Sequence, residues 1–97
     1  MTLAGLPANE IIQQGLEDLA QGRASVAAYL VKIASRRMQR CGIEVPVTDD
    51  EALNADHELY AVLGREYGDE AHNRYNALLR ELVSFERALE ARHRRMR

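Results

Sequence analysis

The stretch AHNRYNALLRELVSFERAL, residues 71–89, carries the most regular apolar pattern in the chain. Its apolar residues follow one another at alternating steps of four and three, at Ala71, Tyr75, Leu78, Leu82, Phe85 and Leu89. Positions spaced in this way lie on one face of an α-helix and form the seam of a helical bundle or coiled coil. The stretch therefore predicts a long amphipathic helix, which we expect to cover residues 70–95.

Three further helices are predicted upstream of this one, over residues 8–21, 25–40 and 49–67. A glycine follows each of them, at Gly22, Gly42 and Gly68. Glycine suits the left-handed position that closes a helix. The fold class is therefore all-α, and we expect an up-down four-helix bundle with a long C-terminal helix. The 97 residues suit a single domain, residues 1–97.

Two helix starts have local signals. Ser25 is a suitable N-cap for the second helix, and Thr48 with Glu51 forms a capping box before the third. The second helix has the widest apolar face, so we expect it to be the most buried. Gly15 and Gly64 lie inside predicted helices, where glycine permits either a close approach of two helices or an exposed, tolerated position.

The predicted lengths of the last two helices differ. Residues 49–67 span about 28 Å as a helix and residues 70–95 about 39 Å. If the third helix is its only neighbour, the end of the long helix, from Leu89 onward, lacks a partner of equal length. We expect the long helix to mediate self-association, with a homodimer as the expected form. Leu89 and Met96 continue the apolar spacing with Arg92 between them, so a frayed basic tail over residues 92–97 is the alternative.

The charges are unevenly distributed behind a net charge of −2. Residues 44–70 hold nine acids against Arg65 alone. Arginines gather at two helix ends, at Arg36, Arg37, Arg40 and at Arg92, Arg94, Arg95, Arg97. The favoured interpretation is that they complement the helix dipoles and face the acids at 49–51 within one molecule. A nucleic-acid footprint and an acidic protein partner are the alternatives.

No set of residues indicates a catalytic, cofactor or metal site. Asp69 and His72, like Glu90 and His93, share a helix face, but the two pairs lie about 31 Å apart along one helix. Cys41 has no histidine near it in sequence, and a nucleophile needs a base within hydrogen-bond reach. Tyr60 is expected to face Tyr75 across the last hairpin, as part of the core. We assign no cofactor.

The single cysteine and the lack of an apolar N-terminal leader favour the cytoplasm. The longest apolar run, residues 26–31, is far short of the roughly 20 residues that cross a bilayer, so no membrane partner is expected.

The functional hypothesis is a small non-enzymatic interaction or regulatory module that binds another protein or itself. The alternative is a nucleic-acid-binding regulator that uses arginines 36–40 and 92–97, and an enzyme is the third class. The candidate interaction surface comprises Leu89, Arg92, Met96, Arg36, Arg37 and Arg40.

Overall fold

The computed structural model describes residues 3–47 and 49–96, with the backbone alone at positions 49 and 50. Its helices are α1 (Asn9–Ala20), α2 (Val26–Arg40), α3 (Asp49–Leu53), α4 (Ala55–Tyr67) and α5 (Ala71–Arg95), with a short 3₁₀ helix η1 (Gly68–Glu70) before α5. All regular structure in this part of the chain is helical, so the all-α prediction is confirmed.

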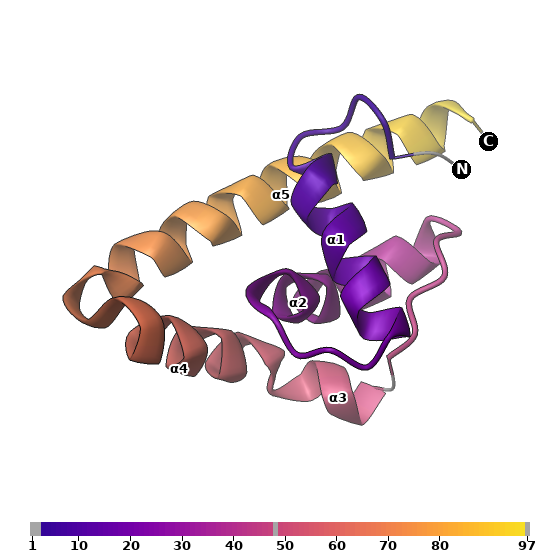
Figure 1. Ribbon diagram of the computed structural model, residues 1–97. Coiled ribbons are helices and arrows are strands. Elements are labelled where there is room, and N and C mark those ends of the chain that lie inside the picture. The colour runs from indigo at the N-terminus through magenta and orange to yellow at the C-terminus, as the bar shows by residue number, and fades with distance from the viewer. Residues whose placement is uncertain (1–2, 48, 97) are drawn as a thin grey trace.

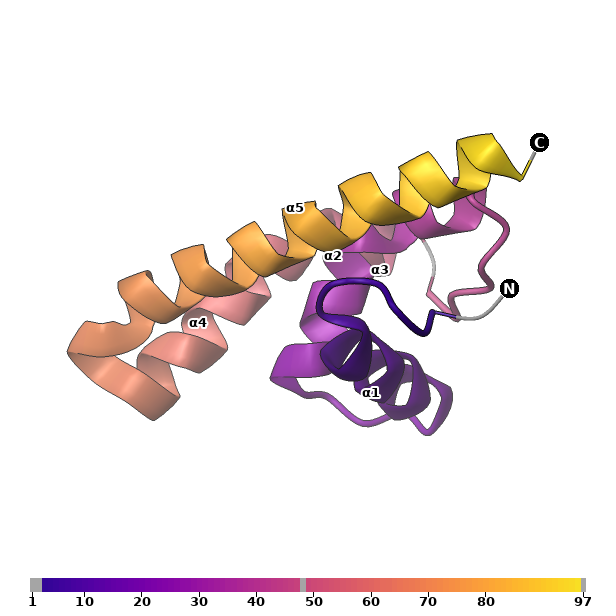
Figure 2. The same cartoon turned by 90° about the horizontal axis from the view of Figure 1, so that it is seen from above.

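The helices are arranged around a splayed hairpin. α4 and α5 run in opposite directions from η1 and diverge, and α2 lies at the open end, where it packs on both of them (Figure 1). α1 packs on α2, and the turn between α4 and α5 projects beyond the other helices in both views (Figures 1 and 2). The molecule measures 43 × 24 × 20 Å. An up-down order of four helices is not confirmed.

The segment predicted as one helix over residues 49–67 is divided in two. α3 ends at Leu53, and α4 begins at Ala55 after Asn54, whose φ and ψ of −111° and 15° are not helical. Burial explains the new helix axis, because Ala55, Leu59 and Leu63 are buried at steps of four along α4 while Leu53 is 73% exposed. Asparagine tolerates such a break, since its side chain competes for backbone hydrogen bonds. The prediction of a continuous helix is wrong here, and Thr48 of the predicted capping box lies outside the described residues.

The core is built on α2, as predicted from its wide apolar face. Seven of its 15 residues are buried, and it contacts α1, α3, α4 and α5. The two helical glycines have different roles. A Cβ atom at Gly15 would overlap the carbonyl oxygen of Ala27 and lie 2.5 Å from Cγ2 of Val31, whereas one at Gly64 would meet nothing within 4 Å. Gly15 therefore permits the close approach of α1 to α2, and Gly64 is an exposed, tolerated glycine.

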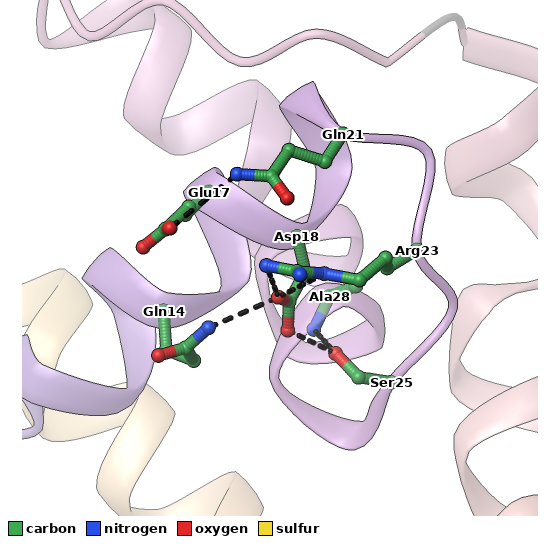
Figure 3. Close-up of polar contacts among 7 residues, drawn as sticks. All are labelled: Gln14, Glu17, Asp18, Gln21, Arg23, Ser25 and Ala28. Carbon is green, nitrogen blue, oxygen red and sulfur yellow. Dashed lines mark hydrogen bonds and ion pairs between the residues drawn. The ribbon is translucent and has the colours of Figure 1, made fainter.

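The turn between α1 and α2 is fixed by a buried carboxylate (Figure 3). Asp18 accepts hydrogen bonds from Gln14 Nε2 at 3.0 Å, Arg23 Nε at 3.1 Å and Ser25 Oγ at 2.7 Å. Ser25 in turn caps α2, because its Oγ accepts from the backbone N–H of Ala28 at 3.0 Å. The predicted N-cap is confirmed. Hydrogen bonds from Ser25, then from Gln14, lower the pKa of Asp18, so the carboxylate stays charged.

The end of α5 is covered, contrary to the prediction from helix lengths. Leu89 is fully buried, and the segment before α1 packs into the same core through Leu3 and Leu6. Arg92 Nη2 donates to the carbonyl oxygen of Ala4 at 3.0 Å. The expectation that α5 lacks a neighbour from Leu89 onward is therefore wrong, because the N-terminal segment and α2 supply one. α5 is helical to Arg95, and a frayed basic tail over residues 92–97 stays a prediction.

Candidate functional site

A groove of about 600 Å³ runs between the C-terminal ends of α2 and α5. Its lining is mainly charged and consists of Arg37, Arg40, Cys41, Glu90, His93 and Arg94. We call it the α2–α5 groove. It joins the two arginine clusters of the sequence, which lie more than 50 positions apart along the chain. Packing of α2 on α5 is what brings them together.

Helix geometry places these side chains in the groove. On α2, Arg37 and Arg40 are three positions apart, and on α5 Glu90 precedes His93 and Arg94 by three and four, so each group lies on one helix face. Both helices end at this pole, where their dipoles are negative and favour cations. Arg40 Nε donates to the carbonyl oxygen of Arg36 at 3.4 Å, as expected for an arginine in a last helical turn.

Arg37 links the two helices through a pair of carboxylates. Its Nη1 lies 3.6 Å from Oε1 of Glu86 and 3.5 Å from Oε1 of Glu90. Glu86 is only 8% exposed, and this burial raises its pKa, partly offset by Arg37. The sequence predicted that acids 49–51 would neutralise the arginines. For Arg37, the carboxylates of Glu86 and Glu90 on α5 do so instead. The side chains of Asp49 and Asp50 lie outside the described part.

Cys41 and His93 share the groove, a proximity that their separation in sequence concealed. The thiol is 5% exposed, and burial, with a further contribution from Glu90, raises the pKa of Cys41. A thiol that stays protonated is a weak nucleophile. Within residues 3–47 and 49–96 no three His, Cys, Asp or Glu side chains are grouped as metal ligands would be. The chemistry that this lining offers is recognition of negative charge.

The six residues of the predicted interaction surface do not form one patch. Arg37 and Arg40 line the α2–α5 groove, and Arg36 is exposed beside them on α2. Leu89 is buried in the core, which removes it from any surface in this fold. Arg92 is half-buried against the N-terminal segment, and Met96 is 65% exposed after the end of α5.

Sequence reasoning placed Arg94 in the basic cluster at 92–97 but left Glu86, Glu90 and His93 out of the site. Their spacing on one face of the last helix was a usable signal, because residues four and seven positions apart align along a helix. The sequence did not indicate which helix packs beside that face. Nothing in the local sequence says that the end of α2, rather than α4, lies beside it.

The opposite end of the molecule, which we call the hairpin tip (residues 60–75), presents aromatic and acidic side chains. The rings of Tyr60 and Tyr75 meet edge to face with centroids 5.1 Å apart, so the predicted contact is confirmed. Tyr60 is nevertheless 43% exposed, which makes it a rim residue rather than core. Arg74 stacks on Tyr67 with 3.9 Å between its guanidinium carbon and the ring centroid.

A second hollow, of about 810 Å³, lies between α1 and the segment after α2. Aliphatic side chains dominate its lining, which includes Leu16, Ile43 and Val45. Gln39 and Glu44 are its only long polar side chains among the described residues that line it. Unlike the α2–α5 groove, this hollow is not lined by charged side chains from two helices of the described chain.

Neither a protein-family model, nor a curated protein, nor a solved structure matches this chain at a significant level. None of the helices within residues 3–47 and 49–96 combines the length and the apolar character that a bilayer crossing requires.

Proposed function

We propose that this chain is a non-enzymatic helical interaction module that binds an acidic segment of a partner protein in the α2–α5 groove. The observation that carries this proposal is the convergence of the two arginine clusters on one groove. Arg37, Arg40 and Arg94 line it together with His93, against the single lining carboxylate of Glu90. Planar guanidinium groups bind carboxylates through two parallel hydrogen bonds, which suits them to such a ligand.

The position of the acids in the groove favours a protein ligand over nucleic acid. Glu86 and Glu90 hold Arg37 from the α5 side, and a phosphate backbone following the arginines would approach both carboxylates. Nucleic-acid binding relies on basic side chains clustered on one face, where they neutralise successive phosphates. The chain as a whole also carries a net charge of −2. A short peptide needs only a few carboxylates, which Arg40 and Arg94 can bind while Arg37 stays with Glu86 and Glu90.

A binding titration with three labelled probes tests this function. Fluorescence anisotropy compares a glutamate-rich peptide, a lysine-rich peptide of equal length and a short DNA duplex, each at several salt concentrations. We expect the acidic peptide to bind and the basic peptide not to bind. The variant R40E/R94E should weaken binding of the acidic peptide by at least about tenfold, since it reverses two charges in the groove.

The matched control is R65E/R80E, which reverses two exposed arginines of α4 and α5 outside the groove. Its affinity for the peptide should stay within about twofold of the unchanged chain. Tighter binding of the duplex, with an affinity that falls steeply as salt rises, would instead support the nucleic-acid regulator that uses arginines 36–40 and 92–97. Absence of binding to either anionic probe would refute both functions.

We further propose that the module works in the cytoplasm. Cys41 is the only cysteine of the chain, and a buried single thiol suits a reducing compartment. Fractionation of cells that express the tagged chain tests this assignment. Recovery in an extracellular or membrane fraction would contradict it.

A further inference from the structure

Charge is separated along the long axis of the molecule. The hairpin tip lies at one end of this 43 Å axis, and the C-terminal ends of α2 and α5 lie toward the other (Figures 1 and 2). The hairpin tip carries three acids against two arginines, while residues 36–40 and 86–96 together carry seven arginines against two acids, Glu86 and Glu90. The two ends therefore carry net charges of opposite sign. Each end attracts the opposite end of a second molecule and repels the same end.

The acids at the end of the tip are available to a ligand. Glu66, Asp69 and Glu70 are exposed, and their carboxylates form no ion pair with any residue of the described chain. η1 presents Asp69 and Glu70 on a narrow turn that projects beyond the other helices (Figure 1). Tyr67, which is 40% exposed, lies next to them in the sequence, and the guanidinium of Arg74 stacks on its ring. The tip is thus a narrow acidic projection.

The groove at the other end retains cationic groups that can meet such a projection. Arg94 is exposed and has no ion pair or side-chain hydrogen bond within the part of the chain that the structure describes. Arg40 is exposed and uses its Nε on the backbone of its own helix, which leaves its terminal nitrogens for a ligand. Arg37 differs, because Glu86 and Glu90 already hold it.

We propose that the acidic ligand of the α2–α5 groove is the hairpin tip of a second copy of this chain, with Asp69 and Glu70 facing Arg40 and Arg94. This inference rests on the proposed function of the groove. The tip and the groove are different surfaces at opposite ends of the molecule. Two copies can therefore pair tip to groove twice in an antiparallel dimer, or once per copy in a longer assembly that keeps a free tip and a free groove. In either arrangement association increases with protein concentration. It weakens with salt, because exposed charges are screened.

Sedimentation velocity of the full chain tests this, over about 10 µM to about 1 mM protein and about 20 mM to about 300 mM salt. The mean sedimentation coefficient should rise with concentration and fall with salt. D69K/E70K reverses the tip and R40E/R94E reverses the groove, and each variant alone should remain monomeric. An equimolar mixture of the two should associate again, because the unchanged acidic tip of R40E/R94E can meet the unchanged groove of D69K/E70K, and the reversed tip can also meet the reversed groove.

The control E10K/E17K makes the same charge change as D69K/E70K at two exposed acids of α1. It should associate like the unchanged chain. Loss of association in this control, failure of the mixture to associate, or an unchanged chain that stays monomeric throughout would each overturn the inference. If the glutamate-rich peptide still binds the groove in that case, the proposed function stands and only the second copy is wrong. If the peptide does not bind either, both are wrong.

Discussion

Gly15 and Gly64 show how one residue type serves two purposes in two helices. Gly15 lets α1 approach the backbone of α2 at Ala27, while Gly64 faces open space on α4. We expect Gly15→Ala to destabilise the fold by about 1–3 kcal/mol through overpacking. Gly64→Ala should stabilise it by about 0.4–1 kcal/mol, because alanine reduces the freedom of the unfolded chain. Urea unfolding measures both, and effects of the same sign would contradict this assignment.

Asp18 makes stability depend on pH at the residue scale. Its hydrogen bonds lower its pKa in the folded state below the ordinary value of 3.8, so its contribution is complete above that value and is lost as pH falls through the lowered pKa. We expect Asp18→Asn to be less stable than the unchanged chain at neutral pH, and this difference to shrink below pH 3.8. Urea unfolding at a series of pH values gives the comparison, with the exposed Glu17→Gln as a control. A difference that does not change with pH would count against this role.

At the scale of elements, α5 is buried at Leu89, near its C-terminal end, as fully as at Phe85 in its middle. Leu89 is fully buried, whereas Met96 is 65% exposed. We expect Leu89→Ala to cost about 2–5 kcal/mol of unfolding free energy, and Met96→Ala to change it by less than about 0.5 kcal/mol. Thermal and urea unfolding of both variants measure this difference. Equal, small effects would mean that the last turns of α5 stand free, as the helix lengths alone suggested.

The helix starts and ends show which local signals were sufficient. Ser25 caps α2, and Gly22, Gly42 and Gly68 have positive φ values of 73°, 86° and 57° after their helices. These caps were predictable from the sequence because a cap depends on neighbouring backbone groups only. The break at Asn54 was missed. No glycine or proline marks it, and the burial of Ala55 and Leu59 against other helices decides the direction of α4.

At the scale of the whole molecule, the arrangement of helices decides what each surface can do. α2 occupies the opening of the α4–α5 hairpin and α1 packs on α2, so the tip of the hairpin is left without a third helix (Figure 1). The same arrangement buries Leu89 and sets Arg40 beside Arg94 in one groove. The surfaces that we propose for association are therefore a charged groove and an acidic tip, and not the apolar end of the last helix.

The sequence by itself determined the helical class, the most buried helix, the cap at Ser25 and the contact of Tyr60 with Tyr75. Each follows from periodicity or from residues that are near one another along a helix or across a short turn. Tertiary structure alone decided that Arg37 pairs with Glu86, that Cys41 and His93 share a groove, and that the N-terminal segment covers Leu89. These contacts join residues about 50 or more positions apart. Their formation depends on which apolar faces bury the most surface together, and burial is non-directional, so a local pattern does not specify its partner.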